Sequence, residues 1–254
     1  MPRNATGWAR WYRRWEAQQE SFNPTREARF TAMLDVLAAT QPARFTALDL
    51  GCGPGPLSVR LLRRFPRARA VAIDHDPVVL AVGRGAWGSF GGRLRWVDAD
   101  LGRPGWAKEL PVRRCDAAVS TTALHWLTDR ALGRFYRELA RALRPGGVFL
   151  NGDRLPWGSD RPDLARLAEQ VRRVRTRGAK LDDEWAGWRA WWAAAEADPA
   201  LGSLFPERER RQSQHPQHGD ARLSTHLRAL RRAGFRRADV LWRDLENCVL
   251  YARR

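Results

Sequence analysis

Cysteine is scarce in this 254-residue chain. The three cysteines, Cys52, Cys115 and Cys248, lie far apart and form no Cys-x-x-Cys pair. Their number and spacing argue against a disulfide framework or a cysteine-based metal site, and they are typical of a protein from a reducing compartment. The N-terminus shows no apolar stretch of the kind found in secretion signals, and no apolar run is long enough to span a membrane. We therefore expect a cytoplasmic protein with no membrane partner.

Lysine is almost absent as well. Lys108 and Lys180 are the only lysines among 45 basic residues, so the formal net charge of +17 comes almost entirely from arginine. Clustered basic groups bind nucleic acid by releasing counterions from its phosphates. The arginines here are spread along the whole chain, whereas a nucleic-acid footprint should be clustered, and a GC-rich coding sequence explains the preference at least as well. A solvated arginine-rich surface is the favoured interpretation, and a nucleic-acid partner remains the alternative.

Short apolar segments alternate with helical segments from Arg44 to Asp153, which is typical of a parallel β-sheet wrapped by helices. The expected strands are Phe45–Leu50, Ala70–Asp74, Leu94–Ala99, Asp116–Ser120, Val148–Gly152, Asp239–Trp242 and Cys248–Ala252. The expected helices are Pro56–Phe65, Pro77–Trp87, Trp106–Leu110, Asp129–Leu143 and Arg222–Ala233. The sequence therefore predicts an α/β fold.

Two segments fall outside this alternation. Residues 8–40 carry aromatic residues at helical spacing and are expected to form one or two helices. Residues 155–219 also read as helical and are rich in tryptophan. We therefore expect an N-terminal helical lid (1–43), a core (44–154 and 220–254) and an inserted helical cap over the substrate (155–219).

A glycine-rich turn, Asp49–Gly55, follows the first expected strand and precedes a helix. Glycines allow a ligand to approach the backbone closely, and the helix N-terminus beyond supplies unpaired N–H groups. Dinucleotide-binding folds place G-x-G-x-x-G here, but Pro56 stands where the third glycine is needed, which disfavours that class. At the end of the second strand, Asp74 can accept hydrogen bonds from ribose hydroxyls. The alternative for Asp74 is a helix cap, a role that Asp76 fills equally well.

Several segments together resemble, in order, the motifs of class I S-adenosylmethionine-dependent methyltransferases of the small-molecule type. They are Leu48–Gly55, Ile73-Asp74, Asp98–Leu101, Cys115–Leu127, Leu143–Leu150, Ala233–Phe235 and Leu241–Ala252. The resemblance implies a three-layer Rossmann-like methyltransferase fold with a mostly parallel seven-stranded sheet and an antiparallel last strand. It also implies S-adenosyl-L-methionine as the cofactor and a methyltransferase activity (EC 2.1.1.-).

The resemblance further implies a set of cofactor-binding residues. Asp49 and the loop backbone would hold the methionine part, Asp74 the ribose, and Asp100 with the Leu101 amide the adenine. Asp98 is a rival for the adenine, but Asp100 is preferred because it lies just past the strand end, where ligands bind in open α/β sheets. The complete expected set is Asp49, Gly51, Cys52, Gly53, Gly55, Asp74, His75, Asp100, Leu101 and Thr121.

The segment Ser120–Leu127 ends the fourth strand and contains the candidate catalytic residue, His125. An imidazole titrates near neutral pH and can act as a general base. The favoured alternative is a packing or cofactor-orienting role, because methyl transfer from a sulfonium chiefly needs an in-line nucleophile in a dry pocket.

The tryptophans of the two helical segments are candidates for an aromatic cap over the substrate, because aromatic rings tolerate the positive charge of the sulfonium. The alternative for about half of them is burial within the helix packing. The expected substrate-binding residues are Trp11, Trp15, Trp126, Trp188 and His215.

Some motifs of other methyl-transferring enzymes are missing. No Asn-Pro-Pro-Tyr or Pro-Cys sequence follows the fourth strand, which argues against methylation of base amino groups and of cytosine C5. His215, His218 and His226 lack a nearby carboxylate in helical register, so no metal is expected. We predict methyl transfer to an O, N or C nucleophile of a small molecule. The alternatives are a tRNA, RNA or protein methyltransferase that uses the basic surface, and a non-catalytic S-adenosylmethionine-binding protein.

Overall fold

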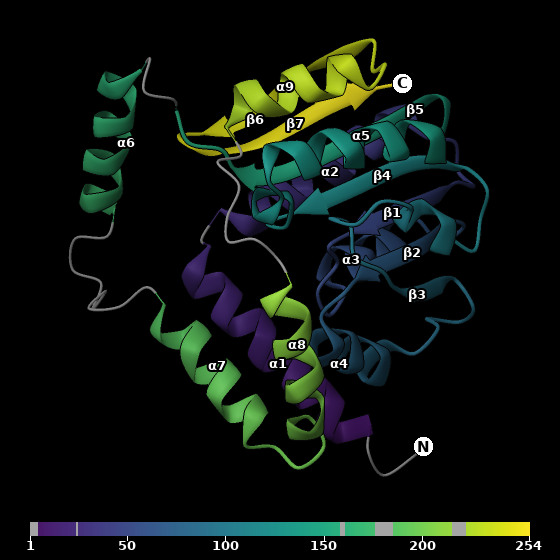
Figure 1. The fold of residues 1–254 in the computed structure, drawn as a ribbon, viewed down its shortest axis with the longest axis vertical. Helices are drawn as coiled ribbons and strands as arrows, with labels where there is room; N and C mark the ends of the chain where they lie inside the picture. Colours follow the sequence, from purple (N-terminus) through teal and green to yellow (C-terminus); the bar gives the residue numbers. More distant parts are fainter. Residues whose placement is uncertain (1–4, 24, 158–160, 176–184, 215–221) are drawn as a thin grey trace.

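A seven-stranded sheet forms the centre of the protein (Figure 1). The computed structural model describes residues 5–23, 25–157, 161–175, 185–214 and 222–254. The strands are β1 (Thr46–Leu50), β2 (Arg69–Asp74), β3 (Leu94–Asp98), β4 (Cys115–Thr121), β5 (Leu143–Arg154), β6 (Arg237–Asp244) and β7 (Asn247–Arg253). Their order is β3-β2-β1-β4-β5-β7-β6. Strands β1 to β5 pair in parallel and β7 runs antiparallel to both of its neighbours, which confirms the predicted sheet.

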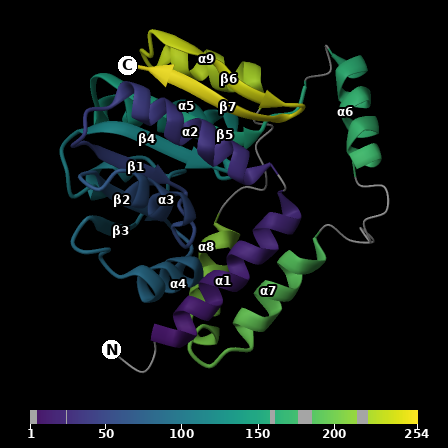
Figure 2. The same ribbon diagram turned by 180° about the vertical axis from the view of Figure 1, so that it is seen from behind.

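Helices cover both faces of the sheet and make the fold three-layered (Figures 1 and 2). One face carries α2 (Arg26–Thr40), α3 (Pro56–Arg64) and α4 (Pro77–Trp87), and the other carries the 3-10 turn η1 (Trp106–Glu109), α5 (Asp129–Ala142) and α9 (Leu223–Arg232). The central strand β1 is buried from Ala47 to Leu50, as expected for a parallel strand covered on both sides. In α5, Leu132, Phe135 and Leu139 recur at helical spacing and are buried against the sheet.

Strand β5 begins five residues earlier than predicted, at Leu143. The predicted helix Asp129–Leu143 ends at Ala142, and the segment Pro145–Gly147 was expected to be a turn before the strand. The C-terminal Arg254 instead exchanges backbone hydrogen bonds with Gly146 (3.0 Å) and Gly147 (3.0 Å). Because this pairing comes from the far end of the chain, the local sequence did not reveal it. The predicted helix Trp106–Leu110 is likewise only the short 3-10 turn η1.

The remaining helices lie beyond the carboxyl ends of the parallel strands. α1 (Ala5–Phe22), α7 (Ala186–Glu196), the 3-10 turn η3 (Gly202–Leu204) and α8 (Phe205–Ser213) pack with α4 in a hydrophobic cluster of their own. α6 (Pro162–Arg175) stands apart in both views and is tied to the strand pair β6–β7 by Arg175–Asp244 and Arg172–Glu246 ion pairs. Within the described ranges, no helix has both the length and the apolar character needed to cross a membrane.

The two N-terminal helices have different partners. α1 packs against α4 and α7, away from the sheet. In α2, Phe30, Met33 and Leu37 are buried in the cluster that lines the sheet itself. The expected lid of residues 1–43 therefore needs a correction, since α2 is part of the core layer and α1 alone lies outside it.

His226 lies in the core behind the sheet, where its Nδ1 is 2.5 Å from the Tyr136 hydroxyl oxygen. Burial lowers the pKa of His226 from 6.5 to about 4. The unfolded chain therefore binds a proton at this histidine between those two values while the folded chain does not. The free energy of unfolding is expected to fall by roughly 3 kcal/mol from this residue as the pH decreases from about 6.5 to about 4.

A His226→Gln variant tests this expectation by urea unfolding at several pH values in that window. Its free energy of unfolding should fall less with decreasing pH than that of the unmodified protein. The difference between the two proteins isolates His226 from the carboxylates that titrate in the same range. An equal fall in both would contradict a neutral buried His226.

Candidate active site

The glycine-rich turn forms a tight backbone cradle between β1 and α3. Gly51, Gly53 and Gly55 have φ angles of +71°, +55° and +84°, which L side chains rarely adopt. A Cβ atom added at Gly51 would lie 2.3 Å from the Cβ of Ala123, so a larger residue there would displace the loop after β4. The amides of Gly51 and Cys52 both donate to the Ile73 carbonyl, at 2.8 and 2.9 Å. The cradle is thus fixed to the end of β2.

Asp49 joins the end of β1 to the first turn of α3. One carboxylate oxygen, Oδ2, accepts hydrogen bonds from the amide (2.9 Å) and hydroxyl (2.6 Å) of Ser58. The other, Oδ1, is buried and has no partner among the described residues. Burial raises the pKa of Asp49 to about 6. An unpaired buried carboxylate oxygen beside the cradle suits a cationic or N–H-bearing ligand.

Asp74 connects the end of β2 to the same cradle. Its Oδ2 accepts from the Gly53 amide at 2.7 Å, and its Oδ1 accepts from the amides of His75 and Asp76 at 2.8 and 3.0 Å. The cap of α4 is Asp76, whose Oδ1 accepts from the amide of Val78 at 2.9 Å. Asp76 thus fills the helix-cap role that was the alternative for Asp74, and Asp74 supports the glycine turn.

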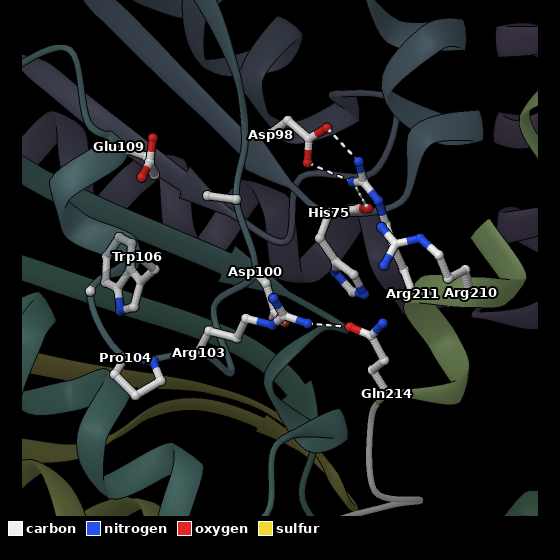
Figure 3. Close-up of a pocket in the computed structure, with 12 residues that line it drawn as sticks. His75, Asp98, Asp100, Arg103, Pro104, Trp106, Glu109, Arg210, Arg211 and Gln214 are labelled. Carbon is white, nitrogen blue, oxygen red and sulfur yellow. Dashed lines mark hydrogen bonds and ion pairs between the residues drawn. The ribbon is translucent and has the colours of Figure 1, made fainter. Parts of the chain in front are cut away.

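A cavity of about 340 Å³ opens beyond the ends of β2 and β3 (Figure 3). His75, Ala99 and Asp100 line it, together with Arg211 of α8 and Gln214, the residue that follows α8. Asp100 stays at the cavity through hydrogen bonding to the Gly102 amide at 2.8 Å.

The rival adenine residue, Asp98, is held differently. Both of its carboxylate oxygens accept from the Arg211 guanidinium, at 2.7 and 3.1 Å. Both aspartates line the cavity, but Asp98 is engaged by α8, whereas Asp100 lies on the loop after β3. Leu101 packs against the core cluster on the α5 side of the sheet, which fixes the backbone next to Asp100.

His125 forms a polar pair with Asp153 at the ends of two adjacent strands. It lies in the 3-10 turn η2 (Leu124–Trp126), and its Nδ1 is 2.9 Å from Oδ1 of Asp153, near the end of β5. Burial alone would lower the pKa of His125, but the charge and hydrogen bond of Asp153 raise it. Burial alone would raise the pKa of Asp153, but His125 and then Arg29 lower it. The two groups therefore stabilise each other as an ion pair.

Arg29 of α2 completes this polar group from the other side. Its side chain is fully buried, and its Nη2 donates to Oγ1 of Thr122 at 3.1 Å. Its Nε and Nη1 meet no hydrogen-bond partner in the described part of the chain. Thr122 has a φ of +51°, an unfavourable angle for a β-branched residue, and its amide donates to the Gly152 carbonyl at 2.9 Å. Backbone strain of this kind is typical of functional sites.

Arg29, Thr122 and Asp153 were missed in the sequence analysis. Asp153 could have been found from its position, because it is an acidic residue near the end of β5, and β5 neighbours the strand that leads to His125. Arg29 gave no such signal, because it lies in a helix that was expected to belong to the lid. Thr121, which was expected at the cofactor, lies at the end of β4 next to Thr122, with their hydroxyl oxygens 3.4 Å apart.

The tryptophans separate into buried and open positions. Trp15 of α1 is half-buried near the cradle, with Cζ2 3.7 Å from a Cβ position built at Gly53. Its ring contacts Trp192, which in turn contacts Trp188, with centroids 6.2 and 5.9 Å apart. Trp126, next to His125, is 53% exposed. Trp15, Trp188 and Trp192 thus form a connected aromatic cluster that reaches the cradle through Trp15.

The prediction that Trp11 binds the substrate is wrong. It is buried between α1 and α7, where its ring packs on Trp191 at 5.6 Å and its indole N–H donates to Asp198 at 3.1 Å. Its surface is used for helix packing and is not available to a substrate. His215 lies outside the described residues, as does His218, and His226 is committed to Tyr136.

The central part of the chain matches a known family. Residues 47–147 match a family described as a methyltransferase domain. A trans-aconitate 2-methyltransferase of Azoarcus sp. (strain BH72) is 36% identical over 124 residues, which are 49% of this chain and 44% of that relative. The chain thus spans about half the length of the curated relatives it matches.

Solved structures share the fold over most of the chain. An O-methyltransferase family protein from Burkholderia thailandensis matches with a TM-score of 0.56 and 17% identity, over 95% of this chain and 59% of that one. Human N-acetylserotonin methyltransferase, in complex with SAM, matches with a TM-score of 0.51 and 17% identity, over 93% of this chain and 56% of that one. The family match covers the strands and loops that build the glycine cradle, Asp74 and His125. Residues 47–147 therefore match a methyltransferase domain, and most of the chain shares the fold of solved methyltransferases.

Proposed function

We propose that this protein transfers a methyl group from S-adenosylmethionine to an O, N or C nucleophile of a small molecule. The observation that carries the proposal is the placement of two groups at neighbouring strand ends. The glycine cradle with Asp74 and Asp100 lies at β1, β2 and β3, and the His125–Asp153 pair lies at β4 and β5. The cradle with its two aspartates suits a nucleoside ligand, and the His125–Asp153 pair suits proton transfer.

The residues present fit S-adenosylmethionine. The cradle has no room for a Cβ at Gly51, Asp49 keeps one buried oxygen unpaired within the described structure, and the cavity beyond Asp100 is open. Asp49 and the cradle would hold the methionine end, Asp74 the ribose, and Asp100 with the Leu101 amide the adenine. When bound, the cofactor supplies an electrophilic methyl group on a sulfonium.

The His125–Asp153 pair gives the site a base. We propose that the Nδ1–H of His125 donates to Asp153, which leaves Nε2 to receive a proton from the acceptor. Asp153 fixes the ring and its tautomer, as a carboxylate does for other catalytic histidines. This role favours an acceptor whose O–H or N–H proton must leave. A carboxylate acceptor, as the name of the trans-aconitate relative indicates for that enzyme, would need no base.

The helices outside the sheet form the proposed cover of the site. α1 contributes Trp15, which lies by Gly53. The inserted segment of residues 155–219 contributes Trp192, which contacts Trp15, and Trp188, which contacts Trp192. An aromatic wall excludes water and tolerates the positive sulfonium. Such a cover suits a small acceptor better than a nucleic acid, so the arginine-rich surface is not assigned to a polyanion. All three cysteines are buried free thiols, which supports a cytoplasmic location.

Calorimetry and a turnover assay test the proposal together. We expect the protein to bind S-adenosylhomocysteine and to form it from S-adenosylmethionine with a small acceptor from a panel of carboxylic acids, phenols and amines. Bulk tRNA is the comparison, tested at low and high salt. Absence of cofactor binding would overturn the function, and cofactor binding without turnover on any acceptor would favour a non-catalytic binder. Turnover on tRNA alone would favour the nucleic-acid alternative.

A further inference from the structure

Helix α8 lies across the ends of the strands that carry the adenosine part of the proposed site. The Arg211 guanidinium donates to both oxygens of Asp98, at 2.7 and 3.1 Å, and to the backbone carbonyl of His75 at 2.6 Å. Its Nε donates to Glu207 at 2.7 Å. One arginine thus joins α8 to the last residue of β3 and to the residue that follows Asp74.

A second arginine makes a parallel connection one turn earlier. Arg208 donates to Oδ2 of Asp76 at 2.8 Å, and both side chains are largely buried. The Arg208 guanidinium also lies over the Trp192 ring, 3.7 Å from its centroid. Asp76 is the residue that caps α4, so α8 is connected to the loop after β2 at two adjacent residues, His75 and Asp76.

The same helix is fixed from its other side by apolar packing. Phe205, at the start of α8, is buried in the cluster formed with Trp11 and Trp191. The position of α8 therefore depends both on its packing with α1 and α7 and on its polar contacts with the strand ends.

Arg211 and Gln214 line the cavity together with Asp100, which comes from the loop after β3 (Figure 3). Gln214 accepts a hydrogen bond from Arg103, which also pairs with Asp100 at 3.2 Å. Arg210, Arg211 and Gln214 are the cavity-lining residues that come from α8 and its C-terminal end, so α8 would cover an adenosine group held beside Asp100.

We propose that Arg211, assisted by Arg208, is a positioning residue for cofactor binding. Its ion pair with Asp98 and its bond to the His75 carbonyl hold α8 as the outer wall of the adenosine pocket. The inference rests on the proposed function, since it concerns the binding of S-adenosylmethionine at this site. It also assigns Asp98 to the support of α8, whereas Asp100 is assigned to the adenine.

The test is calorimetric binding of S-adenosylhomocysteine, which needs no acceptor. Arg211→Gln and Asp98→Asn are each expected to raise the Kd roughly tenfold. The double variant should be no weaker than either single variant, because both remove the same contact. Raising the salt from about 0.05 M to about 0.5 M should weaken binding to the unmodified protein more than to the variants, because partly exposed ion pairs are screened.

Arg64→Gln is the matched control, because Arg64 forms an exposed ion pair with Asp35 at 2.6 Å and neither residue lines the cavity. It should bind like the unmodified protein. As a second measurement, S-adenosylhomocysteine should slow hydrogen exchange of the α8 amides in the unmodified protein and slow it less in Arg211→Gln.

Unchanged or tighter binding in both single variants overturns this proposal and leaves the proposed function intact; tighter binding would show that α8 obstructs the pocket. Failure of the unmodified protein to bind S-adenosylhomocysteine overturns both.

Discussion

Replacing Asp74 by alanine is expected to raise the Kd for S-adenosylhomocysteine by about 100-fold. Hydrogen bonds from a ribose to an ionised carboxylate contribute about 1.5–3 kcal/mol each, so the loss of two such bonds accounts for a change of this size. The substitution also removes the acceptor that the Gly53 amide uses at 2.7 Å and so loosens the glycine cradle. Isothermal calorimetry with S-adenosylhomocysteine measures the change directly.

Two further variants separate ligand binding from folding. Asp74→Asn keeps the shape and one acceptor oxygen, and it should give an intermediate Kd. Asp35→Asn removes an exposed carboxylate of α2 that pairs only with Arg64 among the described contacts, and it should bind normally. Thermal unfolding of each variant shows whether the fold is retained. If Asp74→Ala folds and binds with the affinity of the unmodified protein, Asp74 has no part in holding the ribose.

The cradle and Asp74 could be predicted because their geometry is local. Within ten residues the chain ends a strand, turns through glycines with positive φ and starts a helix. Each of these features can be recognised from the local residue types. Consecutive strands joined by a helix usually lie next to each other in a parallel sheet, so β1 and β2, with Asp49 and Asp74 at their ends, were expected to be neighbours. The sheet itself was predictable for the same reason.

The His125–Asp153 pair depends on information that is not local. The two residues are 28 positions apart and meet because β4 and β5 are in register, with Thr121 opposite Gly152. Arg29 comes from α2, whose packing on the sheet could not be distinguished from that of a lid by helical spacing alone. Buried polar groups of this kind are recognised only when their partners are known.

The role of Arg211 in α8 also could not be predicted from the sequence. Arg211 is one of 45 basic residues, and nothing in its local sequence distinguishes it from the arginines around it. Its role follows from the way the inserted segment itself returns to the strand ends, which places Arg211 against Asp98, 113 residues earlier in the chain. Trp11 and Trp15 likewise share one helical pattern, but one is buried in packing and the other lies by the cradle.

Replacing His125 by glutamine is expected to lower kcat by roughly 100-fold with an acceptor that must lose a proton, because a positioned general base contributes about 100-fold or more. The Kd for S-adenosylhomocysteine should be unchanged. In the unmodified protein, kcat/KM should rise with pH through the raised pKa of His125, because only the neutral ring accepts a proton. This acidic limb should be absent from the His125→Gln profile.

Asp153→Asn tests whether the base depends on its partner. The carboxylate favours the protonated ring, so its removal should lower the pKa of His125 and move the acidic limb to lower pH. The side-chain amide of the asparagine can also stabilise the wrong tautomer of the His125 ring, so kcat should fall even at a pH where the ring is neutral. Asp129→Asn, at an exposed position in the first turn of α5, serves as the control and should keep the unmodified profile. If kcat stays within a few fold in His125→Gln and its pH profile is unchanged, the acceptor is already ionised, as a carboxylate is, and His125 has an orienting role instead.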